Sequence, residues 1–545
     1  MTEAGLPPLA VLRRFRAHDF SLADFLAARV EARGSDPFLL FEGRCWSYRD
    51  FSDHVARLAA LMAARGVQHG DRVGVLSTNH PATAALLFAL ARLGAVMVPA
   101  NPDYGVAEAA YVFGHAGISG LVASPATLAV AESAIAGLAP RPWLMLNEPA
   151  DAADHPVLDD ALAGIDASAV PPQQAEADAT CLLIYTSGTT GFPKGVMHSQ
   201  RNVVLTGEAF VGRMQLQPDE RLLCVLPLFH VNALFYSLCG GVACGGSVAL
   251  ARRFSASRFW QLVAETGASE VNLMAAAARI LMLRDRSEFI PGHRLRKAFI
   301  APMTAEMAAH FTEIFGVRDL IECYGMTEIP GVIGNPFAGE RRIGSMGRIT
   351  PHPDPAIARP EARIVDDRFR EVPHGTEGQL VVRTPTVMQG YWNAPDATEA
   401  AFHQGWFLTG DIVRQDADGY FHFIARAKDI IRRRGENVSG AELDRVIASH
   451  PEVAEAATIG VPSPMGDEDI LAVIVPRPGC RPSAPEIAAF VRARLAPFKA
   501  PRFVAFVESL PQTATQRIEK YKLRRDAELL RGAVDLENTP AAGPG

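Results

Sequence analysis

The sequence predicts an α/β protein, and two observations support this. Short apolar runs at residues 72–76, 95–98, 120–123 and 143–146 are typical of buried strands, and helix-like segments separate them. Strands that alternate with helices form βαβ units, which build a mostly parallel sheet. The composition agrees, because 48% of the 545 residues are hydrophobic and 21% are charged, as in ordinary globular proteins.

Two further segments of the first half have a clear pattern. Residues 81–93 are predicted to be a helix, because Pro81 stands at its start and Gly94 follows its end. Residues 231–251 carry no charge and are long enough to cross a membrane. Four glycines interrupt this segment, so it predicts a buried helix, a turn and a strand rather than a membrane span.

The middle of the chain changes character. Residues 159–180 are rich in Ala, Pro, Gln and acids and are predicted to be a solvated connector, before an apolar strand at 181–185. Residues 363–384 contain two strand-like runs around the turn-like sequence PHGTEG. This pattern predicts antiparallel strands in a small β-barrel-like part of the large domain.

The C-terminal part is predicted to be a smaller α+β domain. The sequences SGAE at residues 439–442 and SAPE at 483–486 are capping boxes that begin helices, and strand-like runs follow at 470–475 and 503–507. We therefore divide the chain into a large domain at 1–427, a small domain at 428–533 and a disordered tail at 534–545.

Charge and cysteine content exclude several classes of protein. The chain has 53 basic and 60 acidic residues, a net charge of −7 that gives no support to nucleic-acid binding. The seven cysteines are odd in number and include no CxxC pair, which argues against a disulfide framework or a zinc site. The N-terminus also lacks the apolar run of a secretory signal. These features predict a cytoplasmic protein with no membrane span.

The most informative motif is YTSGTTGFPKG at residues 185–195. Its two inner glycines let the backbone approach an anion closely, its hydroxyl groups and backbone N–H groups can donate hydrogen bonds, and Lys194 adds a positive charge. The motif follows an apolar strand and differs from a Walker A loop, because GxxxxGK[ST] is absent. It predicts a loop that binds the phosphates of a nucleotide.

Further motifs follow in a fixed order and identify a family. They are LPLFH at 226–230, APM at 301–303, YGMTE at 324–328, TGD at 409–411, RAKDIIRRRG at 426–435 and LPQTATQR at 510–517. With the glycine-rich loop, they resemble the acyl-adenylate-forming superfamily, which includes acyl-CoA synthetases, peptide-synthetase adenylation domains and beetle luciferases. The resemblance implies layered, mostly parallel sheets in the large domain and a mobile small domain.

The resemblance also implies an activity and its cosubstrates. An AMP-forming acid:CoA ligase joins a carboxylic acid to ATP as an acyl-adenylate, releases pyrophosphate and transfers the acyl group to coenzyme A, with Mg²⁺ bound to the phosphates. A carboxylate alone is a poor acylating agent, and the enzyme must hold two anions together during its activation.

Roles for individual residues follow from the resemblance. The residues implied to bind ATP are Thr186, Ser187, Gly188, Thr189, Thr190, Gly191, Lys194, Ala301, Pro302, Met303, Tyr324, Thr327, Asp411 and Arg426. Glu328 is implied to bind Mg²⁺, since this cation prefers carboxylate oxygens. The catalytic residues implied are Arg517, Lys194, Thr327 and Glu328. The acyl pocket is assigned His230, Asn232, Ala276, Gly325 and Met326, and the hinge and CoA tunnel are assigned Lys428, Arg432 and Gly435.

The last motif departs from the family. Its usual ending is PxTxTGK, with a lysine that reaches the substrate carboxylate and phosphate, whereas this chain has Gln516 and Arg517. Arg517 keeps the positive charge and can grip an oxyanion with two donors, although arginine and lysine are not interchangeable at a tight site. Lys520 is the alternative. The hypothesis favoured here is that Arg517 makes the contact.

Several substrates and acceptors stay open. A peptide-synthetase module is disfavoured, because the 28 residues after the last motif leave no room for a carrier domain. The YGMTEIPGVIG segment looks most like carnitine/crotonobetaine-type CoA ligases, but short, medium, branched and aromatic acids remain candidates. The alternatives to a CoA ligase are an adenylate-forming enzyme with another acceptor and a non-catalytic nucleotide-binding relative.

Overall fold

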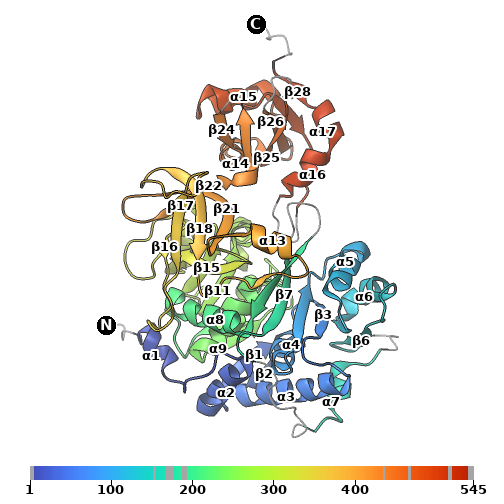
Figure 1. Cartoon of the computed structure of the whole chain (residues 1–545). Helices are drawn as coiled ribbons and strands as arrows, with labels where there is room; N and C mark the ends of the chain where they lie inside the picture. Colours follow the sequence, from blue (N-terminus) through green and yellow to red (C-terminus); the bar gives the residue numbers. More distant parts are fainter. Residues whose placement is uncertain are drawn as a thin grey trace. The chain divides into compact units, whose positions relative to one another are not determined.

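The computed structural model describes residues 5–150, 155–166, 176–186, 193–433, 436–463, 468–512 and 518–537. The chain forms two compact units, each made from two stretches of sequence. The first unit comprises Met1–Ala362 and Val382–Phe407, and the second comprises Arg363–Val381 and Leu408–Gly545. Figure 1 follows the chain from its blue N-terminal elements to its red C-terminal ones.

A seven-stranded sheet forms one layer of the first unit. Five of its six strand pairs are parallel, as expected of an α/β fold. The last pair in the order given below is antiparallel. The strand order is β13 (Asp319–Ile321), β12 (Lys297–Ala301), β11 (Glu270–Met274), β9 (Arg221–Cys224), β10 (Ser247–Leu250), β1 (Pro37–Phe41) and β2 (Arg44–Ser47).

A second seven-stranded sheet forms another layer. Its order is β19 (Gly390–Tyr391), β8 (Lys194–Ser199), β7 (Thr180–Thr186), β4 (Val96–Ala100), β3 (Arg72–Leu76), β5 (Gly120–Ala123) and β6 (Trp143–Leu146). The five strands from β7 to β6 are parallel, whereas β8 and β19 are antiparallel to their neighbours. The strands expected at the four apolar runs are confirmed, β3, β5 and β6 with the same bounds.

Buried helices join the two sheets through one core. Helix α4 (Pro81–Arg92) is buried at every residue from Pro81 to Ala91, which is the pattern of a helix that is covered on all sides. The same core contains Leu182 of β7 and Leu222 of β9, so the two sheets share it. Helices α3 (Tyr48–Ala64) and α8 (Gln200–Met214) contribute further residues.

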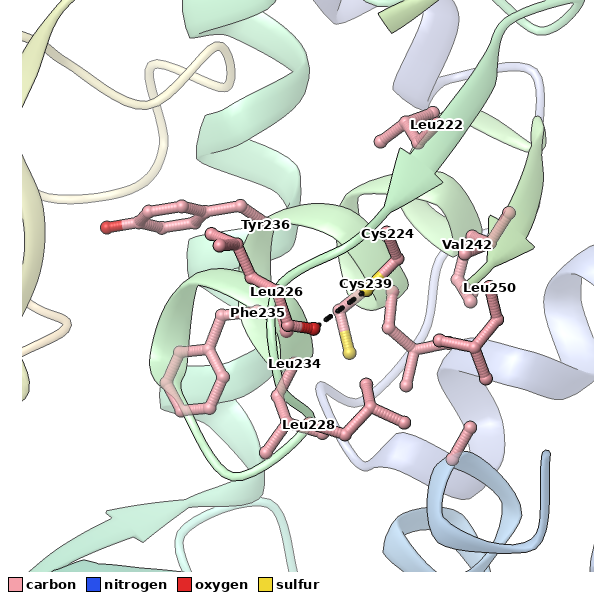
Figure 2. Close-up of a cluster of buried hydrophobic side chains, with 14 of the residues drawn as sticks. Leu222, Cys224, Leu226, Leu228, Leu234, Phe235, Tyr236, Cys239, Val242 and Leu250 are labelled. Carbon is pink, nitrogen blue, oxygen red and sulfur yellow. Dashed lines mark hydrogen bonds between the residues drawn. The ribbon is translucent and has the colours of Figure 1, made fainter. Parts of the chain in front are cut away.

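The charge-free segment at 231–251 is buried inside this core. It forms a π-helix, η3 (Asn232–Leu238), then α9 (Cys239–Cys244) and strand β10. Figure 2 shows its apolar side chains, among them Leu234 and Val242, packed with those of β9 and β10. The predicted helix, turn and strand are confirmed. In the described part of the chain, no helix has the length and hydrophobicity needed to cross a membrane.

The first unit contains further helices along the chain. They are α1 (Pro8–Leu12), α2 (Leu22–Arg33), α5 (Val106–Ala116), α6 (Leu128–Ile135), α7 (Leu158–Leu162), α10 (Phe259–Thr266), α11 (Ala275–Leu283), α12 (Ala305–Ala309), the π-helix η5 (His310–Ile314) and α13 (Pro395–Ala400). A three-stranded antiparallel sheet joins β14 (Cys323–Met326), β15 (Ile329–Gly334) and β16 (Arg348–Ile349).

One expected loop is partly helical. Residues 159–180 were expected to be solvated throughout, but α7 occupies Leu158–Leu162. Leu158 and Leu162 are buried in the main core, because residues four apart lie on one face of a helix. The polar composition of the segment gave no sign that Leu158 and Leu162 would form a helix and pack into the core.

A five-stranded sheet stands where the small barrel-like part was expected. Its order is β17 (Glu361–Val365), β18 (Glu377–Arg383), β21 (Trp406–Gln415) and β20 (Phe402–His403), and β22 (Phe421–Arg426) also pairs with β21. Strands β20 and β22 both run antiparallel to β21. The two strand-like runs predicted at residues 363–384 correspond to β17 and β18, which are neighbours in this sheet.

The C-terminal part has the predicted α+β structure. A four-stranded sheet has the order β25 (Val453–Pro462), β26 (Glu468–Pro476), β27 (Phe503–Phe506) and β28 (Val534–Asp535), next to a hairpin of β23 (Ile430–Arg433) and β24 (Glu436–Ser439). The helices are α14 (Gly440–Ala448), α15 (Ala484–Arg492), α16 (Lys520–Arg525) and α17 (Ala527–Arg531). Ser439 and Ser483 cap α14 and α15, as the two capping boxes predicted.

The expectation of a disordered tail from residue 534 is wrong for its first residues. Val534 pairs with Val504, and the Asp535 carboxylate lies 3.0 Å from Arg502 Nη2. A strand partner and an ion pair outweigh the polar composition that suggested disorder. Residues 538–545 lie outside the described residues.

A buried carboxylate on α8 gives a test of the first unit's stability. Glu208 is 6% exposed, and its oxygens lie 3.0 Å from His18 Nε2, 3.5 Å from His352 Nε2 and 4.0 Å from Arg29 Nη2. Burial alone would raise the pKa of Glu208, but the contacts with His18 and His352 outweigh it and lower the pKa to about 2. Its ordinary value is 4.5, so its stabilising contribution is present above pH 4.5 and is lost as the pH falls toward 2.

We expect Glu208→Gln to lower the free energy of unfolding by about 3 kcal/mol at pH 7, because the variant leaves Arg29 without its counter-charge. The difference from the natural chain should shrink as the pH falls below 4.5. Urea unfolding at a series of pH values measures both effects, with Glu313→Gln as a control at an exposed carboxylate. A difference that stays constant from pH 7 to pH 3 would contradict this role of Glu208.

Candidate active site

The glycine-rich motif joins β7 to β8. Strand β7 ends at Thr186, strand β8 begins at Lys194, and these two residues pair with each other. The hairpin therefore holds Thr186 and Lys194 side by side at the base of the loop. Five residues predicted to bind phosphate lie outside the described residues: Ser187, Gly188, Thr189, Thr190 and Gly191.

Lys194 and Glu328 meet at one tyrosine. The Tyr391 hydroxyl donates a hydrogen bond of 2.9 Å to Glu328 Oε1, and Lys194 Nζ lies 4.8 Å from the centre of the Tyr391 ring. Burial and the negative charge of Glu328 raise the pKa of Tyr391 well above its usual range, so Tyr391 stays a donor. A lysine and a carboxylate thus lie near each other, although more than 130 residues separate them in sequence. This arrangement suits a polyphosphate with its cation.

The YGMTE motif forms a tight hairpin of β14 and β15. A Cβ atom at Gly325 would lie 2.4 Å from the backbone nitrogen of Gly331, so only glycine fits there. The Thr327 carbonyl accepts a hydrogen bond of 2.8 Å from His198 Nε2. Burial lowers the pKa of His198 to about 4, so its ring is neutral at pH 7 and carries the donated proton on Nε2. The contact holds the predicted phosphate-binding threonine in place.

A buried carboxylate links the two segments predicted to enclose adenine. Glu322 Oε1 accepts a hydrogen bond of 3.0 Å from the backbone N–H of Met303. Glu322 directly precedes the strand that carries Tyr324, and Ala301 ends β12. The structure therefore brings the segment Ala301–Pro302–Met303 beside the strand of Tyr324. Burial raises the pKa of Glu322 to about 7, although the backbone N–H of Met303 acts in the opposite direction.

The residues predicted for the acyl pocket include buried polar atoms without partners. His230 Nε2 and Asn232 Oδ1 have no hydrogen bond within the described structure, and neither has Asn272 Oδ1. The Asn272 amide donates to Ser237 Oγ at 2.8 Å, which joins β11 to η3. Burial lowers the pKa of His230 to about 4, so it is neutral. Unpartnered buried polar atoms call for an added group such as a ligand or water. Ala276 lies nearby in sequence, on α11.

The two residues predicted to hold the ribose lie together in the second unit. Arg426 Nε is 2.8 Å from Asp411 Oδ1, and Asp411 is fully buried. The TGD motif lies inside β21 rather than in a turn, and Gly410 has a φ of +68° there, which favours glycine. The Thr409 hydroxyl accepts a hydrogen bond of 3.1 Å from the backbone N–H of Asp411 and so helps to position it.

The hinge and CoA residues are only partly described. Gly435 and Arg517 lie outside the described residues, as do the side chains of Lys428 and Arg432. Arg433 is buried and donates to the carbonyls of Phe498 and Ala500, so this member of the arginine run has an internal role.

Three residues of this site were missed in the sequence. Tyr391, His198 and Glu322 lie outside the motifs that carried the resemblance. His198 had a detectable signal, because it shares a strand face with Lys194 at an interval of four residues. Tyr391 and Glu322 had none, since only the tertiary fold brings them to Glu328 and Met303.

Metal-binding side chains are sparse in this part of the molecule. Within the described ranges, no three His, Cys, Asp or Glu side chains group in a way that could hold a metal ion. Tyr391 engages one oxygen of Glu328, and a single carboxylate oxygen fits a cation whose remaining ligands come from phosphate and water.

Lys194 and Glu328 lie around Tyr391 at one edge of a mainly parallel sheet, an arrangement that suits an α/β enzyme that binds a nucleotide. Comparison with known proteins makes the class specific. The AMP-binding enzyme family matches residues 26–392, and the AMP-binding enzyme C-terminal domain matches residues 442–517. The chain belongs to the AMP-binding enzyme family.

Its relatives share both length and chemistry. Sulfoacetate–CoA ligase from Cupriavidus necator is 34% identical over 93% of this chain and 98% of its own length. Feruloyl-CoA synthase from Amycolatopsis sp. is 35% identical, covering 89% of this chain and 94% of its own. Crotonobetaine/carnitine–CoA ligase from Proteus mirabilis is 32% identical, covering 89% and 95%. The predicted class, an acyl-CoA synthetase of the acyl-adenylate-forming superfamily, is confirmed.

Solved structures agree. ATP-bound MatB from Rhodopseudomonas palustris superposes with a TM-score of 0.83 at 28% identity, covering 93% of this chain and 99% of that one. Anthranilate CoA ligase AuaEII in complex with anthranoyl-AMP has a TM-score of 0.83 at 26% identity, covering 93% and 97%. The predicted α/β fold, with large parallel sheets and a smaller C-terminal domain, is confirmed.

Proposed function

We propose that this enzyme uses Mg²⁺ and ATP to convert a carboxylic acid into an acyl-adenylate and then transfers the acyl group to coenzyme A. The observation that carries the catalytic assignment is the meeting of Lys194, Tyr391 and Glu328. A cation and a carboxylate beside a phosphate loop oppose the repulsion between the acid and the α-phosphate during attack.

Each nucleotide group has assigned residues in this proposal. Lys194 and the loop from Thr186 to Gly191 hold the phosphates, Thr327 bonds the α-phosphate, and Glu328 binds Mg²⁺ through the oxygen that Tyr391 does not engage. Tyr324 stacks on adenine opposite Ala301, Pro302 and Met303. Asp411 and Arg426 bind the ribose, and their mutual ion pair supports this assignment because it orients the carboxylate.

The second half-reaction uses the small domain at 428–533. Lys428 is the pivot, and Gly435 and Arg432 face coenzyme A. Arg517 makes the adenylation contact in place of the usual lysine. The environment of Lys520 supports this choice, because Lys520 Nζ lies 2.6 Å from Asp444 Oδ2 and is already paired inside its own domain.

The acid binds in a pocket formed by His230, Asn232, Ala276, Gly325 and Met326. Relatives named for sulfoacetate, feruloyl and crotonobetaine substrates show how widely acids differ in this family. The protein works in the cytoplasm, a location supported by seven cysteines, all within the described residues and all without a disulfide.

Pyrophosphate release tests the reaction. We expect release that depends on ATP, Mg²⁺ and a suitable acid, and a thioester product once coenzyme A is added. A panel of acids should include short, dicarboxylic, sulfonated, branched, aromatic and quaternary-ammonium members. Acid-dependent release without thioester formation would indicate another acceptor, and ATP binding without release for any acid would indicate a non-catalytic relative.

A further inference from the structure

Helix α8 ends with a buried arginine that has no counter-charge. Arg213 is 3% exposed, and its Nη2 donates to the Gly331 carbonyl. Its Nε and Nη1 atoms have no hydrogen-bond partner within the described residues, and no carboxylate of that part of the chain lies within 4.0 Å of its guanidinium. A buried cation with two unsatisfied donors is costly, so this site calls for an anionic partner.

A tyrosine hydroxyl lies beside the same guanidinium. A Cβ atom placed on Gly331 would lie 2.5 Å from Arg213 Nη1 and 2.8 Å from the Tyr236 hydroxyl oxygen. Both polar groups therefore face one glycine, which has a φ of +53°. Figure 2 shows the Tyr236 ring leaving the apolar cluster with its hydroxyl directed away from the leucine side chains. Arg213, Tyr236 and Gly331 are called the Arg213 site below.

The Arg213 site adjoins the acyl pocket from two directions. Gly331 is packed against Gly325, because a Cβ atom on Gly325 would lie 2.4 Å from the Gly331 nitrogen. Tyr236 stands four residues after Asn232 in the π-helix η3, about one turn further on. Gly325 and Asn232 are both assigned to the acyl pocket, so the Arg213 site lies next to residues of that assigned pocket.

The surroundings of the guanidinium also favour an anion. Arg213 lines a small hollow with a volume of about 20 Å³. Its polar lining consists of Thr350, His352, Thr384 and Thr386 beside Arg213, and neither Asp nor Glu lines it. Glu208, one and a half turns earlier on α8, is occupied by His18, His352 and Arg29. The local charge is therefore positive and is surrounded by hydroxyl groups.

We propose that Arg213 and Tyr236 bind a second anionic group, a carboxylate or a sulfonate, at the far end of the acid substrate. This inference rests on the proposed function, because it concerns the acid that the enzyme adenylates. The unpartnered Nη1 of the guanidinium donates to the oxyanion, and the Tyr236 hydroxyl beside it donates a second hydrogen bond. The same site repels acids that end in a quaternary ammonium group, and it leaves the donors unsatisfied when an acid ends in a methyl or aryl group.

Matched pairs of acids test the proposal through acid-dependent pyrophosphate release. The pairs are malonate and propionate, succinate and butyrate, and sulfoacetate and 3,3-dimethylbutyrate, with crotonobetaine as the cationic acid. We expect at least one dianionic acid to exceed its monoanionic partner in kcat/KM by about 100-fold. The sulfoacetate pair separates sulfonate from carboxylate recognition.

Variants then locate the effect. We expect Arg213→Met to reduce the ratio of dianionic to monoanionic kcat/KM to about 1, and Tyr236→Phe to reduce it by about 10-fold. Arg221→Met is the matched control, because Arg221 also donates to a carbonyl, that of Thr266, away from this site. If Arg213→Met does not fold, Tyr236→Phe still decides the matter, since it removes only one oxygen atom.

Three results would overturn the proposal. The first is a natural enzyme that prefers the monoanionic acids or crotonobetaine, which would leave the ligase activity intact. The second is an Arg213→Met variant that lowers both members of a pair equally, which is the mark of a structural role. The third is a Tyr236→Phe variant with an unchanged ratio. Failure of the proposed function is a different result, because no acid would then release pyrophosphate.

Discussion

Arg517→Ala is expected to slow acyl-adenylate formation by about 100-fold or more. The arginine supplies a positive charge to the substrate carboxylate and the α-phosphate, and this charge offsets their repulsion as they approach. The thioester step from a preformed acyl-adenylate should keep its rate within a few-fold, because that step uses the other orientation of the small domain. Single-turnover assays of the two half-reactions measure this split directly.

Lys520→Ala is the comparison for this prediction. Lys520 pairs with Asp444, which also accepts hydrogen bonds from Thr458, so its loss should reduce the stability of the small domain. We expect adenylation by folded Lys520→Ala enzyme to stay close to that of the natural chain. If Lys520→Ala instead loses adenylation selectively while Arg517→Ala does not, Lys520 is the catalytic residue.

Glu328→Gln should raise the Mg²⁺ concentration needed for half-maximal adenylation and lower the maximal rate by about 10- to 100-fold. Glutamine keeps an oxygen that accepts the Tyr391 hydrogen bond, so the local fold should survive while the anionic ligand is lost. A titration of pyrophosphate release against Mg²⁺ at fixed ATP gives both quantities.

Glu361→Gln serves as the control for charge removal, because Glu361 is an exposed carboxylate that lies 4.0 Å from Arg383. It should titrate like the natural enzyme. An unchanged Mg²⁺ requirement in Glu328→Gln would remove Glu328 from the metal site, and the hydrogen bond to Tyr391 would then be its main role.

Local patterns in the sequence predicted many elements of the fold. The two capping boxes begin α14 and α15 at the expected serines, because capping depends on residues only three apart. Strands β3, β5 and β6 have the expected bounds, because strands of a parallel sheet are buried on both faces and remain apolar throughout. The connector at 159–180 and the tail after 534 were less accurate, since one buried apolar pair or one strand partner can order a polar segment.

The sequence by itself determined the family and the order of its motifs, because a phosphate loop and short capped turns encode their chemistry in neighbouring residues. Only the tertiary structure decided which residues support them. Tyr391 reaches Glu328 across 63 positions of sequence, and Arg213 reaches Gly331 across 118. No periodicity or composition marks such pairs, because their contacts arise when separate strands and helices pack into one core. The unpartnered charge of Arg213, and with it the proposed second anion of the substrate, became visible only there.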